Sequence, residues 1–155
     1  MPTFHQAPDM SALNRIEQYL DFMLYVLRAD GVVDRMEKLH MLNLMVEGLK
    51  LEPALIEKYK TELEKKEWEP VTDEQLEAVM SGLEPSSLAH LVRDAYGLAA
   101  SDGEIHDAEI SVVRRGLRVA GIPAERFAEV DLWARQSLAL AHRGTLLLSR
   151  DGVSE

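Results

Sequence analysis

The feature that most constrains the fold of this chain is an acidic turn that occurs twice. The string Asp-Gly-Val-Val at 30–33 is followed by Glu37, and Asp-Gly-Glu-Ile at 102–105 is followed by Glu109, a displacement of 72 residues. Each copy follows one apolar, helix-like stretch and precedes another. The sequence therefore predicts two helix-turn-helix halves related by an internal pseudo-duplication, with carboxylates at each bend.

Apolar residues recur at three- and four-residue spacing along most of the chain, and no strand-like alternation is sustained. Aromatic residues make up only 6%, so Leu, Ala, Val and Met fill most of the core, as helices favour. We predict a single all-α domain of about seven helices in an orthogonal or irregular bundle. The first three expected helices are 11–29, which Ser11 caps, 34–49 and 53–66. A short fourth helix is capped by Thr72 and Gln75, and a fifth runs from Ser86 or Ser87 to Gly103. The sixth runs from the second turn to Ala120, and the seventh is 124–140.

The predicted domain organisation is simple. Residues 1–10 form an N-terminal arm, residues 11–140 form the helical domain, and residues 141–155 form a C-terminal tail that is either a short hairpin or a docked segment. Gly97 and Gly116 fall inside expected helices, where each costs on the order of 1 kcal/mol relative to Ala. Close approach between helices is the expected reason for both glycines.

Composition excludes several classes of function. The net charge of −10 repels phosphate backbones, and we interpret Arg114, Arg115 and Arg118 as partners of neighbouring acids rather than as a nucleic-acid site. The absence of cysteine excludes disulfides, thiolate metal sites and thiol nucleophiles. No secretory leader and no apolar run of about 20 residues is seen, so we expect a cytoplasmic protein that does not insert into a membrane.

The turns are compatible with only half of a calcium-binding EF-hand loop. The glycine, the β-branched residue and the glutamate have the spacing of positions 6, 8 and 12 of that loop. Positions 1 and 3 are Val26 and Arg28 in the first copy, and Leu98 and Ala100 in the second. None of these side chains coordinates a hard cation, so neither turn is an EF-hand.

Two interpretations of the acidic residues remain open. In the first, they only end and start helices, since Asp34 with Glu37 and His106 with Glu109 have the spacing of an N-cap and the third residue of a helix. Capping does not require Asp30 or Asp102, which stand where the helix dipole disfavours negative charge. In the second interpretation, the acids of both turns converge on a divalent cation.

Catalytic motifs are missing from the chain. His5, His40, His90 and His142 form no HxxxH or HExxH pair, and no glycine-rich phosphate loop or serine-nucleophile motif occurs. We expect no enzyme and no catalytic residues. An enzyme that uses paired carboxylates would need a deep pocket beside them and at least one carboxyl group with a raised pKa.

The two turns, extended to 29–37 and 100–109, resemble the paired motifs of the tellurite-resistance TerB-like family. The resemblance covers about residues 11–138 and implies an all-α domain with clustered acidic residues that bind divalent metal. Carried over to this chain, it implies a site of Asp30, Asp34, Glu37, Asp102, His106 and Glu109. One departure is that His106 stands where the first copy has Asp34, so the half-sites need not bind equally.

The resemblance implies a function in tellurite or metal stress response, with a protein partner that belongs to a membrane-linked system. The hypothesis from the sequence is a non-enzymatic acidic module that binds Ca²⁺, Mg²⁺, Mn²⁺ or Zn²⁺ at the paired turns. The alternative is a protein-interaction or co-chaperone-type module without metal, in which the acids serve as helix caps.

Overall fold

The computed structural model describes residues 10–150, except for the side chains of residues 10–14 and of Asp102. Most of the predicted arm and the end of the predicted tail lie outside the described residues. In the described part the chain is all-α, with seven α-helices, one π-helical turn (η1) and two 3-10 turns (η2, η3). Their bounds are α1 Met10–Leu27, α2 Arg35–Asn43, η1 Leu44–Gly48, α3 Pro53–Leu63, α4 Asp73–Met80, α5 Pro85–Ala99, η2 Ala100–Asp102, α6 Asp107–Val119, η3 Ala124–Arg126 and α7 Phe127–Leu147.

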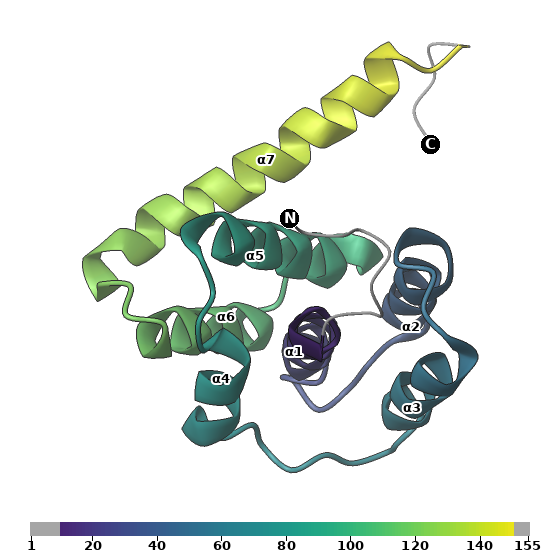
Figure 1. Ribbon diagram of the computed structural model, residues 1–155. Coiled ribbons are helices and arrows are strands. Elements are labelled where there is room, and N and C mark those ends of the chain that lie inside the picture. Colours follow the sequence, from purple (N-terminus) through teal and green to yellow (C-terminus); the bar gives the residue numbers. More distant parts are fainter. Residues whose placement is uncertain (1–9, 151–155) are drawn as a thin grey trace, which may run out of the picture.

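Helix α1 lies at the centre, with α2, α3, α4, α5 and α6 arranged around it (Figure 1). Its apolar residues are spread over more than one face, so it buries side chains against several helices at once. The buried set on α1 is Leu20, Phe22, Met23, Leu24, Val26 and Leu27. The predicted all-α single domain is therefore confirmed, whereas the internal pseudo-duplication stays a prediction.

Helix α6 approaches the centre closely at Gly116. A Cβ atom built there would lie 2.5 Å from Met80 Cε on α4 and 2.9 Å from Phe22 Cε1 on α1. A methyl group at these distances would force the Met80 and Phe22 side chains to shift, so the absence of a side chain at Gly116 lets them pack directly against α6. At Gly97, by contrast, the nearest atom would be Leu138 Cδ2 at 3.5 Å, which is ordinary contact. The expected close approach is thus found at Gly116 and not at Gly97.

Three tyrosines tie helices together by donating to aspartates on neighbouring elements. The bonds are Tyr19 to Asp94 at 2.8 Å, Tyr59 to Asp21 at 2.7 Å and Tyr96 to Asp131 at 2.6 Å. They join α1 to α5, α3 to α1 and α5 to α7. Each tyrosine ring fills apolar space, while its hydroxyl group makes a hydrogen bond.

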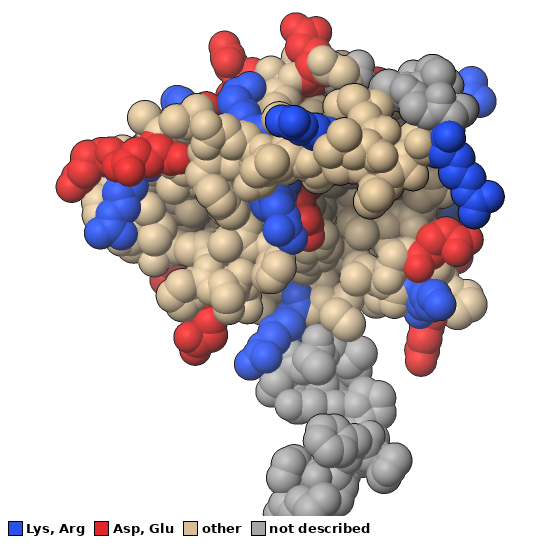
Figure 2. Space-filling model, turned by 90° about the horizontal axis from the view of Figure 1, so that it is seen from above, with Lys and Arg blue, Asp and Glu red and all other residues tan. Residues whose placement is uncertain are grey.

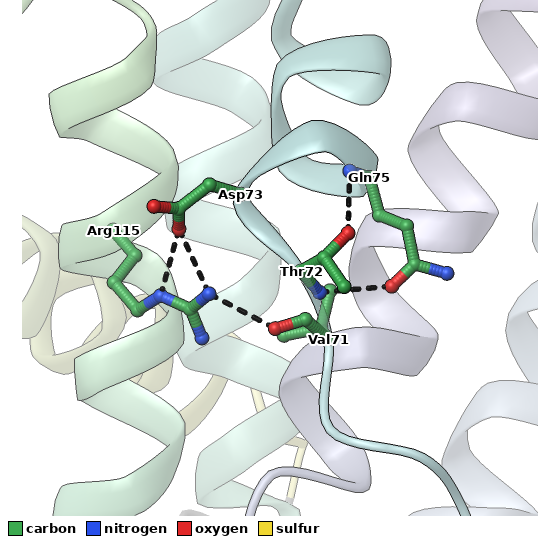
Figure 3. Close-up of polar contacts among 5 residues, drawn as sticks. All are labelled: Val71, Thr72, Asp73, Gln75 and Arg115. Atoms are coloured by element: carbon green, nitrogen blue, oxygen red, sulfur yellow. Dashed lines mark hydrogen bonds and ion pairs between the residues drawn. The ribbon is translucent and has the colours of Figure 1, made fainter.

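The segment before α4 is held from α6 by Arg115 (Figure 3). Its guanidinium donates to Asp73 Oδ1 at 2.8 Å and to the Val71 carbonyl at 2.9 Å. The predicted capping box is present beside it: Gln75 N donates to Thr72 Oγ1 at 3.1 Å, and Thr72 N donates to Gln75 Oε1 at 2.9 Å. The pairing of Arg115 with an acid agrees with the interpretation from the sequence.

Some helix ends differ from the expected positions. Helix α1 begins at Met10, so Ser11 lies inside its first turn rather than capping it. Helix α5 begins at Pro85, because proline suits the first helical position, where its missing N–H is no loss. Helix α7 continues to Leu147, through the point where a hairpin or docked tail was expected.

Candidate functional site

The two Asp-Gly turns have the same backbone form. Gly31 has φ +84° and Gly103 has φ +91°, a left-handed conformation that glycine adopts without steric cost. Each glycine N–H closes the preceding helix, by donating to the Arg28 carbonyl at 3.0 Å and to the Ala100 carbonyl at 2.9 Å respectively. The sequence prediction that these glycines end helices is confirmed.

Both glutamates complete a cap on the following helix. Glu37 N donates to Asp34 Oδ1 at 2.9 Å, and Asp34 N donates to Glu37 Oε1 at 3.1 Å. In the second turn His106 N donates to Glu109 Oε1 at 3.0 Å. Each glutamate therefore uses one carboxyl oxygen, Oε1, to satisfy a backbone donor that the helix start leaves open.

The same two glutamates are buried, and they are the buried charged residues in the described part of the chain. Glu37 is 3% exposed and Glu109 is 1% exposed. The second carboxyl oxygen, Oε2, is shielded from solvent in both, and Oε2 of Glu37 receives no donor among the described residues when both groups are ionised. Burying a carboxylate without a full set of partners carries a large desolvation cost.

The two buried carboxyl groups face each other across the turns. Burial, followed by the hydrogen bond between the Glu37 and Glu109 side chains, raises the pKa of Glu37 to about 8. The charge of Glu109 acts in the same direction, while the N–H of Asp34 lowers this pKa. Two carboxyl groups in contact do not ionise together easily, so without a cation the pair holds one proton near neutral pH.

Local packing explains how residues far apart in sequence meet. Turn η2, which contains the second acidic bend, packs against both α2 and α5. Met41 and Val113, one helical turn after Glu37 and Glu109, are buried in the core and fix the same inward helix faces. The glutamates are carried inward with these faces rather than out to solvent.

The remaining predicted ligands do not all join this pair. Asp30 is exposed, and its Oδ1 accepts from Val32 N at 3.0 Å within its own turn. Asp34 and His106 stand at the two N-caps and are half-buried. The side chain of Asp102 lies outside the described residues. Asp30 thus has a local structural role in its own turn. The sequence argument had treated Asp30 as unexplained by helix capping and had not considered this role.

Among the described side chains, no group of three or more His, Asp or Glu residues is close enough together to hold a metal ion. The Asp102 side chain falls outside that statement. The described donor set at the centre of the site is therefore two carboxyl groups. It fits a cation in charge and in chemistry, since hard divalent ions take carboxylate oxygens, but further oxygen donors are needed to complete a coordination shell.

The cavities near the turns do not open onto the carboxyl pair. A cavity of about 360 Å³ behind the first turn is lined by Arg28, Asp30, Gly31, Trp68 and Arg115, among others, but by neither Glu37 nor Glu109. A raised carboxyl pKa is present, as acid–base catalysis would require, but the pair is closed to a substrate in this conformation.

Sequence reasoning named both glutamates but gave most weight to Asp30 and Asp102. The structure instead makes Glu37 and Glu109 the centre of the site. No local sequence signal marked these two glutamates as the carboxylates that turn inward, because their burial depends on contacts between distant positions.

Comparison with known proteins gives one match. Residues 18–132 match the protein-family model described as tellurite resistance protein TerB, and this range includes both turns. No curated protein and no solved structure matches the chain. Within the described residues, no helix combines the length and apolar character that a membrane span requires.

Proposed function

Because the chain belongs to the TerB family of tellurite-resistance proteins, we propose that it is a non-enzymatic helical module that binds a divalent metal ion between its two acidic turns during metal or tellurite stress. The observation that carries this proposal is the buried pair Glu37 and Glu109, one from each turn. A cation between these carboxylates would replace the shared proton and offset their repulsion.

The side chains proposed to hold the ion are Glu37 and Glu109 at the centre, each through Oε2, because Oε1 is used in capping. Asp102 and His106 are proposed as further ligands from the second turn, and Asp34 and Asp30 as weaker contributors from the first. Oxygen donors favour Ca²⁺, Mg²⁺ or Mn²⁺ over Zn²⁺. Once bound, the ion would supply charge neutralisation and a link between the two turns.

The proposed consequence of metal binding is conformational rather than chemical. A cation joining Glu37 to Glu109 would fix α2 against the start of α6. Helix α2 and the adjoining η1 carry Met36, Leu39 and Val46, which are 55%, 44% and 47% exposed. Exposed apolar residues of this kind are typical of protein-contact surfaces, so the proposed partner is a protein of the stress-response system.

The second candidate is an interaction module without metal. It is favoured by the caps, because the bonds of Glu37 and Glu109 to Asp34 and His106 already give each glutamate a structural role. In that case the shared proton of the buried pair would not be displaced by a metal ion. The two candidates differ in what they predict for metal titrations.

The experiment is calorimetric titration of Ca²⁺, Mg²⁺, Mn²⁺ and Zn²⁺ into chelator-treated protein. The wild type is compared with Glu37→Gln and Glu109→Gln, which keep the size and the capping oxygen but remove the charge. Glu57→Gln, an exposed glutamate on α3, is the matched control. An Asp30→Asn, Asp102→Asn double variant measures what the outer acids add.

Saturable binding that is lost in Glu37→Gln and Glu109→Gln but kept in Glu57→Gln would support the metal site. Absence of binding by the wild type for all four ions would favour the interaction module, with the glutamates acting as helix caps. Binding that survives both central substitutions would place the metal elsewhere and overturn this site.

A further inference from the structure

The far half of α7 extends away from the helical body (Figure 1). Its near half is anchored to α5, by the bond from Tyr96 to Asp131 at 2.6 Å and by Leu138 against Gly97. Further along, Leu140, Leu147 and Leu148 are 68%, 71% and 86% exposed. Leaving such leucines in water forgoes roughly 1.5–3 kcal/mol for each that would otherwise be fully buried.

Three of the exposed apolar residues of α7 have a regular spacing, whereas the exposed Leu132 lies outside it. Trp133, Leu140 and Leu147 are each seven residues apart, so they lie along one side of the helix as a seam. Ser137 and Gly144 fall between them at four-residue intervals, and their small size allows another helix to come close. The seam contains no charged residue. Figure 2 shows one face of the molecule, on which charged side chains are scattered among broad uncharged areas.

We propose that this seam, defined as Trp133, Ser137, Leu140, Gly144 and Leu147, pairs in antiparallel fashion with the same seam of a second copy of the chain. A two-fold axis at Leu140 places Leu140 of one copy against Leu140 of the other. It also places Leu147 of each copy against Trp133 of the other, which closes the pair with identical contacts on both sides.

Trp133 gives the leucines of the second copy a place to bind. It lines an apolar groove of about 390 Å³ together with Leu88, Ile122 and Val130. In the antiparallel pair, Leu147 and the neighbouring Leu148 of the second copy reach the mouth of this groove. The most exposed leucines of one copy therefore meet the largest apolar recess beside the same helix of the other.

Charge and shape favour the antiparallel over the parallel arrangement. The stretch 125–135, at the near end of α7, carries three acids and two arginines and so has a net charge of −1, whereas the far end carries Arg143 and Arg150. Antiparallel pairing sets the acidic end of one copy beside the basic end of the other and aligns the helix dipoles favourably. It also puts the two helical bodies at opposite ends of the pair, where they do not collide.

The seam is short, which sets the expected affinity. Trp133 to Leu147 spans about 21 Å at 1.5 Å per residue. Such a contact buries less than the roughly 1,600 Å² of a standard protein interface. We therefore expect a reversible dimer with a Kd on the order of micromolar rather than a permanent one.

The test is sedimentation velocity of the full chain over a concentration series from about 5 to 500 µM, in a range set by the expected affinity. The wild type should move from an apparent mass of 17.4 kDa toward twice that value as concentration rises. Leu140→Glu and Leu147→Glu should stay monomeric. Leu49→Glu, at an exposed leucine that follows η1 and with the same change in charge, is the control and should dimerise like the wild type.

The direction of pairing is tested by cross-linking, because the chain has no cysteine of its own. In an antiparallel pair, Leu140→Cys should form a disulfide between copies. Leu147→Cys should not, because its two copies lie about 21 Å apart along the helices and disulfides need Cα atoms within about 7 Å. A parallel pair would link at both positions.

Three results would overturn the proposal. A wild type that stays monomeric at every concentration would exclude the dimer. Dimerisation that Leu140→Glu and Leu147→Glu leave unchanged would place the contact on another surface. Efficient cross-linking at both cysteine positions would exclude the antiparallel seam. The Glu37→Gln variant should dimerise normally, so a failure of the metal site and a failure of this dimer can be told apart.

Discussion

The first and second acidic turns share a backbone but differ in the side chains around it. Both have a left-handed glycine and a buried glutamate that accepts from the N-cap backbone. The first turn is capped by Asp34 and carries the exposed, apolar Val32, whereas the second is capped by His106 and has Glu104 at the corresponding place.

This comparison distinguishes the residues that bring the two carboxyl groups together from the residues that change the charge around them. Both turns keep a left-handed glycine, Gly31 or Gly103, and a buried glutamate, Glu37 or Glu109. These shared residues bring the two carboxyl groups together in the interior. The caps and outer residues set the charge around the pair.

The largest expected effect comes from removing one charge of the buried pair. In metal-free protein at pH 8, Glu37→Gln or Glu109→Gln should raise the free energy of unfolding by on the order of a few kcal/mol, because each relieves the burial of two like charges. Equilibrium denaturation measures this. If the two turns contribute equally, the free energy of unfolding rises by the same amount in both variants. A rise in only one variant would show that the pair is not symmetric.

The pair also predicts a pH dependence of definite sign. The pKa of Glu37 is about 8 in the folded protein, against an ordinary value of 4.5 for a glutamate side chain. Between these two pH values the folded state therefore holds a proton that the unfolded state releases. The contribution of this proton to the free energy of unfolding is full below pH 4.5 and is lost as pH rises toward 8. The free energy of unfolding of the metal-free wild type should therefore decrease relative to that of Glu37→Gln as pH rises over this range, so that the advantage of the variant grows. A constant difference would contradict the raised pKa.

A smaller effect is expected at the two glycines. Gly31→Ala and Gly103→Ala should each cost roughly 1–2 kcal/mol, because a Cβ disfavours the left-handed conformation even where space is open. Gly97→Ala, inside α5 and in ordinary contact with Leu138, is the matched control and should be neutral or stabilising. Thermal unfolding of the three variants compares them. A much larger loss of stability at one turn would mean that the two turns, despite the same backbone form, contribute unequally to the stability of the fold.

The smallest expected effect is at the cap of the first turn. Asp34→Ala should cost about 1 kcal/mol, because the Glu37 N–H loses its acceptor. Asp34→Asn should cost little, since asparagine caps equally well. Equal losses in the two variants, measured by denaturation, would show that the charge of Asp34 matters more than its hydrogen bond, and that the first turn depends on electrostatics.

Features set by neighbouring residues were predictable from the sequence. The caps at Thr72 and Asp34, and the helix ends at Gly31 and Gly103, depend on only a few consecutive positions. Gly116 was also predictable, because a glycine inside an amphipathic helix needs a packing reason and Met80 and Phe22 supply it.

Features set by distant contacts were not predictable in the same way. The contact of Glu37 with Glu109 joins positions 72 residues apart, and nothing local states which carboxylates turn inward. The length of α7 was missed for a different reason. Residues 141–155 were expected to form a hairpin or a docked segment, but the single glycine in this stretch of α7, Gly144, costs only about 1 kcal/mol, and the helix continues through it to Leu147.

The central claim is that two separate turns form one site through Glu37 and Glu109. A double-mutant cycle of Glu37→Gln and Glu109→Gln, measured by denaturation with and without saturating Ca²⁺ or Mn²⁺, tests it most directly. We predict that without metal each single change stabilises the protein and the second adds little, and that with metal each single change alone removes the whole metal-induced stabilisation. Additive effects of the two changes in both conditions would show that the glutamates act independently and would contradict a shared site.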